Sequence, residues 1–248
     1  MHAQNSGWFR GGATALGLSG LLFATFPIVR PFYTDLALDP NGAALTISSP
    51  LWVVSHLMLI VALVLLPFGL LTVFVELESN RVRRLALIGV VLGIAGGGLF
   101  LPVAGVEAFA LPAIARQYLQ GQTVSLEAIV AAHTALQATV LVPALAMLGL
   151  GGVFIATAVG RSGRFSRWVG IPFALGLMFF LPLLPQPIRI IDGVLIGIGA
   201  LGLAWALWQG RSETTAAVPL RHRTRTRRTS ELRNHALAKD LDRLERPL

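Results

Sequence analysis

Long apolar runs separated by short charged stretches dominate the pattern of the chain. A helix needs about 20 apolar residues to cross the roughly 30 Å hydrocarbon core of a bilayer. By this criterion the sequence predicts an all-α, polytopic membrane helix bundle within residues 1–209, followed by a tail over residues 210–248. Six transmembrane helices are predicted, at about residues 11–29, 51–75, 85–105, 128–159, 169–184 and 193–208.

The third and fourth runs extend beyond what a membrane span requires. The residues after position 105 remain compatible with a helix, and the fourth run is longer than the bilayer is thick. We therefore expect both helices to continue above the membrane and to meet at Gly121 and Gln122. This would form an extracytoplasmic helical hairpin over about residues 106–137.

Basic residues are distributed unevenly along this pattern. Cytoplasmic segments of membrane proteins carry an excess of Lys and Arg. Arg10, the arginines at 81–84, those at 161–167 and the whole tail fall on one side of a six-span arrangement. The other side receives only Arg30, Arg116 and Arg189. The sequence therefore predicts a multi-pass protein of the plasma (inner) membrane with both termini in the cytoplasm, and a first span that is retained as an anchor.

Composition supports the membrane assignment and removes several chemistries. Hydrophobic residues make up 54% of the chain and charged residues 13%, whereas about 25% of a soluble domain is charged. The chain has no cysteine, which excludes disulfides, thiolate metal ligands and cysteine nucleophiles. It also lacks the zinc-protease motif HExxH, a nucleophile elbow and a phosphate-binding loop. No catalytic residue is therefore predicted, and the sequence argues against an enzyme.

Two sets of glycines recur at helical spacing. Small residues four apart let neighbouring helices approach closely in a membrane. The sets are Gly89, Gly93 and Gly97 in the third span and Gly193 and Gly197 in the sixth. They are predicted to be helix-packing surfaces, used either inside the bundle or at the seam of a homo-oligomer.

Polar residues near the predicted outer ends of the spans form a candidate cluster. At 1.5 Å per residue, His56, Glu107, His133 and Gln137 all lie about 30 to 39 Å from the cytoplasmic ends of their helices. His133 and Gln137 share one helix face, because they are four residues apart. We predict a cluster of Glu107, His133, Gln137 and His56, with Arg30, Arg189 and Asp192 as possible neighbours.

Several roles remain open for this cluster. The residues can be ordinary polar groups at the membrane edge, where a charge costs little because water and headgroups solvate it. A carboxylate beside an imidazole can instead transfer protons or bind a solute. Two imidazoles with a carboxylate can hold a metal, and His56 with His133 could ligate haem from both sides. The sequence contains no motif for a metal site, and any cofactor is unknown.

The tail carries a dense basic run. Five arginines fall within eight residues, Arg221, Arg223, Arg225, Arg227 and Arg228. Such a run beside a bilayer attracts anionic lipid headgroups, at about 1 kcal/mol per basic residue. Nucleic acid could also bind it, but tethering to the membrane favours lipid. A short amphipathic helix is predicted after Ser230.

The function predicted from the sequence is a non-enzymatic membrane protein, an accessory, assembly or interaction subunit that binds a protein partner or a second copy of itself. The first alternative is a small solute or proton-coupled transporter, which would use the outer polar cluster and proline-broken helices. The second alternative is a haem- or metal-binding redox protein of the membrane.

Overall fold

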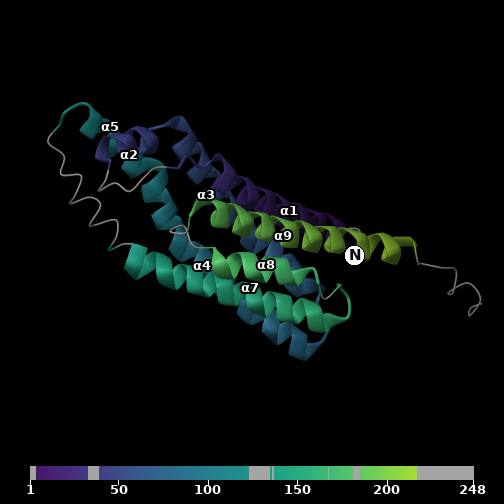
Figure 1. The fold of residues 1–248 in the computed structure, drawn as a ribbon. Coiled ribbons are helices and arrows are strands. Elements are labelled where there is room, and N and C mark those ends of the chain that lie inside the picture. Colours follow the sequence, from purple (N-terminus) through teal and green to yellow (C-terminus); the bar gives the residue numbers. More distant parts are fainter. Residues whose placement is uncertain are drawn as a thin grey trace, which may run out of the picture. The chain divides into compact units, whose positions relative to one another are not determined.

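The computed structural model describes residues 4–32, 39–122, 135, 137–166, 168–180 and 185–216. The chain divides into two compact units, Met1–Trp208 and Gln209–Leu248. Every regular element within the described residues is a helix, so the predicted all-α class is confirmed (Figure 1). The first unit contains the membrane-type helices and the candidate site.

The helices follow one another along the chain with short connections. They are α1 (Gln4–Val29), α2 (Pro40–Ile47), α3 (Pro50–Glu76), α4 (Asn80–Gly105), η1 (Val106–Ala110), α5 (Leu111–Leu119), η2 (Gln137–Leu141), α7 (Val142–Ser162), α8 (Gly170–Phe179) and α9 (Gln186–Ala216). The two elements labelled η are π-helical turns, in which the backbone hydrogen bonds span five residues instead of four.

Among the described residues, five helical stretches are long and apolar enough to cross a membrane. They are Gly7–Val29, Pro50–Glu76, Asn80–Leu119, Ala138–Ser162 and Gln186–Gln209. In the described part of the segment predicted as the fifth span, residues 169–180, the helix is α8, and residues 181–184 lie outside the described residues. Ten helical residues span about 15 Å, half of the hydrocarbon core, so α8 does not cross by itself.

The last helix begins earlier and ends later than predicted. Its expected range was 193–208, whereas α9 begins at Gln186 and continues to Ala216. Arg189 and Asp192 therefore lie inside the helix. Their side chains are 6% and 4% exposed, so both are directed into the bundle.

The hairpin predicted over residues 106–137 is described for its first arm. α4, η1 and α5 follow one another directly from Asn80 to Leu119, and the helix stops at a turn where Gly121 has φ +75°. That left-handed conformation strongly favours glycine. Residues 123–134, which include His133, lie outside the described residues.

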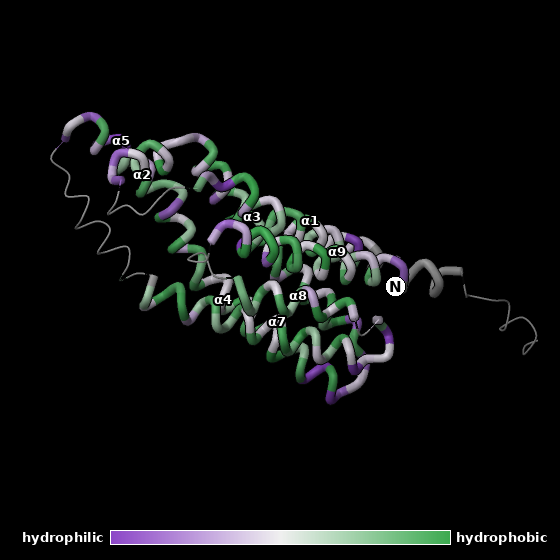
Figure 2. The backbone as a smooth tube through the Cα atoms, viewed as in Figure 1, coloured by the Kyte–Doolittle hydropathy of each residue, from purple (hydrophilic) through white to green (hydrophobic). Residues whose placement is uncertain are grey.

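Apolar side chains cover both the inside and the outside of the helices. Figure 2 shows apolar colour along most of α3, α4 and α7, with hydrophilic positions gathered at helix ends and turns. Leu16, Leu63, Leu148 and Ile155 are completely buried in one continuous core. Large apolar residues also remain exposed on every long helix, as expected for surfaces that face lipid.

Glycine determines how closely the long helices pack. A Cβ added at Gly89 would lie 2.9 Å from the carbonyl oxygen of Gly151 on α7, and one at Gly93 would lie 2.7 Å from the Leu70 side chain on α3. A Cβ at Gly193 would lie 2.7 Å from the carbonyl oxygen of Phe23 on α1. Gly97 and Gly197 likewise face α3 and α1. These glycines therefore pack against helices of the same chain.

Contacts between helix ends define one end of the bundle. Arg10 near the start of α1 lies over the Trp208 ring in α9, at 5.8 Å from its centroid. Arg83 in the first turn of α4 lies over the Phe74 ring near the end of α3, at 5.0 Å. A Cβ at Gly12 would collide with the Thr72 side chain, so the start of α1 also lies against the end of α3. The opposite end carries α2 and α5, which pack against each other (Figure 1).

Candidate functional site: a buried polar cluster

Five polar side chains from four helical elements are buried toward the α2–α5 end of the bundle. We call them the polar cluster: Arg30, His56, Glu107, Arg189 and Asp192. Each is at most 9% exposed. Arg30, Glu107 and Arg189 all lie within electrostatic reach of His56, and Asp192 follows Arg189 by three residues on the same buried face of α9. The sequence predicted a common depth for His56 and Glu107 and named the other three as possible neighbours; the structure shows that all five are buried in protein.

His56 is held in one orientation by its own helix. Its Nδ1 lies 2.7 Å from the carbonyl oxygen of Trp52, one turn earlier in α3. The Trp52 ring covers one face of the imidazole with centroids 4.7 Å apart, and the Phe26 ring meets it edge-on at 5.6 Å. Because a carbonyl only accepts, Nδ1 must carry the proton in this contact.

The other ring nitrogen of His56 faces a carboxylate. Nε2 lies 3.7 Å from Oε2 of Glu107. With Nδ1 protonated, the neutral imidazole presents a lone pair at Nε2, and an ionised carboxylate also only accepts. The two groups become complementary when a proton is held on one of them. The contact between Nε2 and Oε2 is therefore favourable only when one of the two groups carries a proton.

The backbone around Glu107 explains how this residue reaches the cluster. Glu107 lies in η1, where the N–H of Leu111 bonds to the carbonyl of Val106 instead of that of Glu107. The next residue, Pro112, has no N–H to offer. The indole Nε1–H of Trp52 donates to the Glu107 carbonyl instead, at 2.8 Å. Trp52 thereby completes the wide turn that carries Glu107.

Trp52 connects most of the cluster. It is fully buried, and the guanidinium of Arg30 lies over its ring at 4.6 Å from the centroid. Trp52 stands near the beginning of a span, where an indole often lies at the membrane surface, but here its ring is enclosed by protein. Trp8, Trp168, Trp205 and Trp208 do remain exposed.

Four phenylalanine rings pack beside the cluster. Phe180, directly after α8, lies 5.4 Å from Phe23, 6.3 Å from Phe26 and 6.2 Å from Phe100 between ring centroids. Phe26 also contacts His56, so the aromatic group adjoins the polar cluster directly. α8 ends at this aromatic group, where the chain meets α1 and α4.

A small apolar cap covers the other side of Trp52. Ala44 and Ile47 of α2 and Ala115 of α5 form a separate buried group with the indole. Both α2 and α3 start with a side-chain cap followed by proline. Asp39 accepts from the N–H of Gly42 before Pro40, and Ser49 accepts from the N–H of Trp52 before Pro50. These signals favour helix initiation and could have predicted α2, which the sequence analysis missed.

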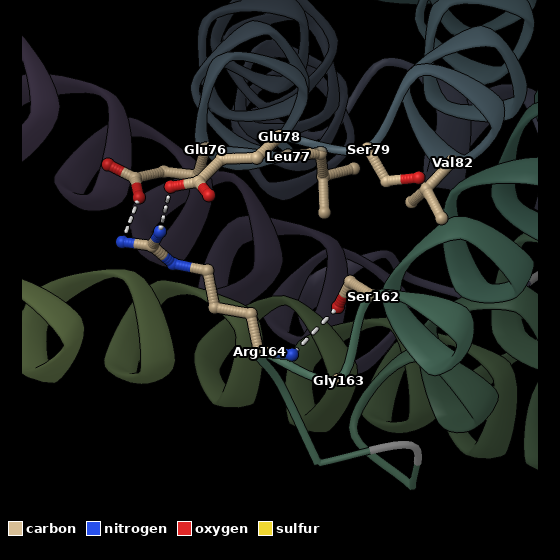
Figure 3. Close-up of a pocket in the computed structure, with 8 residues that line it drawn as sticks. All are labelled: Glu76, Leu77, Glu78, Ser79, Val82, Ser162, Gly163 and Arg164. Atoms are coloured by element: carbon tan, nitrogen blue, oxygen red, sulfur yellow. Dashed lines mark hydrogen bonds and ion pairs between the residues drawn. The ribbon is translucent and has the colours of Figure 1, made fainter.

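The opposite end of the bundle carries an ion-paired group that we call the clasp: Glu76, Glu78 and Arg164 (Figure 3). Arg164 Nη2 lies 2.5 Å from Oε2 of Glu76, and Nη1 lies 3.4 Å from Oε1 of Glu78. The three residues line a pocket of about 390 Å³ between the α3–α4 turn and the α7–α8 turn. Gly163, at φ +67°, ends α7 and turns Arg164 toward the two glutamates.

Some residues predicted for the site lie outside the part of the chain that the structure describes. His133 lies outside the described residues, as do Arg221, Arg223, Arg225, Arg227 and Arg228 of the tail. Gln137 is the first residue of η2. η2 ends two residues before Pro143, just as η1 ends two residues before Pro112. Only the backbone of Gln137 is described. Bis-histidine haem ligation by His56 and His133 therefore stays an untested prediction.

The described residues of the cluster can be compared with the donor sets that metal sites require. Within the part of the chain that the structure describes, no three His, Asp or Glu side chains are grouped so that they could hold a metal ion. The cluster instead combines a histidine–carboxylate pair with two guanidinium groups and a further carboxylate. Comparison with known proteins adds no precedent, because no family model, no curated protein and no solved structure matches the chain.

Proposed function

We propose that this protein is a small membrane transporter that binds a polar solute at the polar cluster and moves protons with it. The observation that carries the proposal is the His56–Glu107 pair, which is buried among charged groups from four helical elements. Ionisable residues inside a membrane bundle are costly to bury and typically mark solute or proton paths.

The broken helix beside the cluster supports this function. Transporter sites commonly form where helices are interrupted within the membrane. Here α8 ends next to the cluster, and η1 widens the helix at Glu107 itself. π-helical turns of this kind recur at functional sites. Both irregularities lie at the depth where the polar side chains gather.

The proposal includes six spans with both termini in the cytoplasm of a plasma-membrane protein. In this arrangement α8, with the residues that follow it, counts as the fifth, interrupted span. The basic residues Arg10, Arg83 and Arg164 gather at one end of the bundle, which the positive-inside rule assigns to the cytoplasm. The polar cluster then lies toward the outside.

Topology can be tested directly, because the natural chain lacks cysteine. Single substitutions Ser79→Cys, at the clasp end, and Gln122→Cys, beyond α5, should react with a membrane-impermeant maleimide from opposite sides of the membrane. We expect Gln122→Cys to label in intact cells and Ser79→Cys to label only after permeabilisation. The reverse labelling pattern would invert the proposed orientation.

Transport can be tested in proteoliposomes without knowing the solute in advance. Panels of small amino acids, carboxylates, sugars and inorganic ions should be screened for solute-evoked current on a supported membrane. We expect one class to evoke a current that Glu107→Gln reduces at least tenfold. Glu78→Gln, which removes an exposed carboxylate at the other end, is the matched control. A current that is equal in both variants would contradict the proposal.

The accessory role predicted from the sequence gives a different result in the same preparation. A partner that co-purifies in fixed stoichiometry, together with a flux indifferent to Glu107→Gln, would support an accessory or interaction subunit. An absorbance spectrum with a Soret band that disappears in His56→Ala would instead support haem ligation.

We also propose that the basic tail binds anionic lipid. Its five clustered arginines provide the attraction, which is screened by salt. When the full-length protein is reconstituted in nanodiscs that contain phosphatidylserine, we expect its tail to be protected from trypsin. In nanodiscs of phosphatidylcholine alone we expect less protection. Equal protection in the two lipids would contradict this binding.

A further inference from the structure

Asp192 differs from the other acidic residue of the cluster in its partners. Its side chain is 4% exposed, and its Oδ2 has no hydrogen-bond partner among the described residues. Glu107, in contrast, faces His56, and its backbone carbonyl receives the Trp52 indole. The His56–Glu107 pair does not involve Asp192. A buried carboxyl group in this position requires its own explanation.

The surroundings of Asp192 are mostly backbone and hydrocarbon. On the α8 side, a Cβ at Gly176 would lie 2.8 Å from the Asp192 carbonyl oxygen, so the α8 backbone passes directly against α9 here. On the α1 side, the next residue, Gly193, packs against Phe23 and Pro27. Helical side chains point back toward the N-terminus of their helix, so the Asp192 carboxyl is directed toward the level of Arg189 and the end of α8.

The charged group next to Asp192 along the buried face of α9 is Arg189, three residues earlier. Arg189, Arg30 and Glu107 in turn lie within electrostatic reach of His56, which places Asp192 at the edge of the polar cluster. The described part of α8 contributes no charged group. Arg189 and Arg30 disfavour a metal cation, and the described residues provide no cage of oxygen ligands for one.

An ionised carboxylate buried without a partner costs several kcal/mol, and such a group either is paired or takes up a proton. We propose that Asp192 is the proton-binding carboxyl group through which the cluster couples solute binding to proton uptake. The assignment names the coupling ion of the proposed transporter and so rests on that function. In the step, a hydronium ion of the outer water gives up a proton: one of its O–H bonds breaks, an O–H bond forms on the Asp192 carboxylate, and a neutral water molecule remains.

The charge of the cluster then changes with each proton. Protonation removes the negative charge of the Asp192 carboxylate, three residues from Arg189 on the buried face of α9, so the cluster becomes more positive by one unit. A more positive cluster attracts an anion. The solute class that follows is a small anion, which binds after the proton and leaves with it.

Infrared difference spectroscopy of the reconstituted full-length protein tests the assignment without a transport assay. We expect the wild type near neutral pH to show the carbonyl stretch of a protonated carboxyl group that shifts in D₂O. Asp192→Asn should remove this band, whereas Glu78→Gln, at the clasp end, should keep it. Asp192→Glu should retain a band at a shifted frequency, which controls for a variant that does not fold.

The outcomes separate the two proposals. A band unchanged in Asp192→Asn, or one lost in Glu107→Gln but not in Asp192→Asn, would overturn the assignment. A band abolished by Na⁺ at fixed pH would assign the carboxyl to Na⁺ and would also overturn it. If the band depends on Asp192 but no solute evokes a current, the transporter function fails while the proton site stands.

Discussion

The two ends of the bundle use charge in opposite ways. At the clasp end, Arg164 pairs with Glu76 and Glu78 beside a surface pocket, and Glu78 is almost fully exposed. In the polar cluster, His56 and Glu107 are buried within the bundle. Exposed ion pairs contribute about 0 to 1 kcal/mol, whereas desolvating a charge costs several. The Arg164–Glu78 pair of the clasp is an inexpensive surface contact, although Glu76 beside it is buried, whereas the polar cluster places several charged groups in the costly interior.

Trp52 offers the largest expected effect, because it supports the cluster from inside. Trp52→Ala would leave a cavity and an unsatisfied Glu107 carbonyl, and we expect a loss of about 3 to 5 kcal/mol of stability. Trp205→Ala, at a residue that is 65% exposed, is the matched control and should change little. Thermal unfolding in detergent measures both. If the Trp52→Ala and Trp205→Ala variants melted at the same temperature, Trp52 would contribute no more to stability than an exposed tryptophan.

The contact between α8 and α9 should give an intermediate effect. A Cβ at Gly199 would collide with the Phe173 backbone, so Gly199→Ala must push α8 away from α9. We expect a loss of about 1 to 3 kcal/mol, as for other overpacked sites. Gly98 meets nothing within 4 Å, and Gly98→Ala should be neutral or slightly stabilising. A tolerated Gly199→Ala variant would show that α8 moves freely against α9.

The clasp should give the smallest effect. Arg164→Gln breaks both ion pairs. Glu78 is 90% exposed and the arginine side chain 36% exposed, so water compensates for most of the loss there, whereas Glu76 is 7% exposed and is compensated less. We expect about 1 kcal/mol, reduced further by salt. Unfolding at low and high ionic strength measures it. A loss comparable with that of Trp52→Ala would mean that the clasp also belongs to the interior.

The sequence predicted the long helices because their apolar runs are unambiguous. It also predicted one depth for His56, Glu107 and Arg30, since the rise per residue fixes height along a helix. It could not predict which way each side chain faces. That direction depends on η1, whose wide turn repositions Glu107, and on the α2–α5 cap, which buries Trp52.

The pattern of apolar residues also could not predict where α8 ends, because that pattern continues past the end of the helix. Residues 169–184 are as hydrophobic as a span, yet the helix stops at Phe179. Pro182 shortly after that point gives a local reason to stop, because proline disfavours helical backbone in the residue before it. The place where Phe180 meets Phe23, Phe26 and Phe100 follows from tertiary packing alone.

The close seam between α1 and α9 has a consequence for assembly. A Cβ at Gly197 would lie 3.2 Å from the Gly20 carbonyl oxygen, so the first and last long helices meet almost backbone to backbone. The residues of helices α2 to α8 lie between α1 and α9 in the chain and are therefore synthesised before α9. We therefore expect the groove on α1 to stay open to lipid until α9 has been synthesised, and the charged groups near both helices to be enclosed only when α9 packs into that groove.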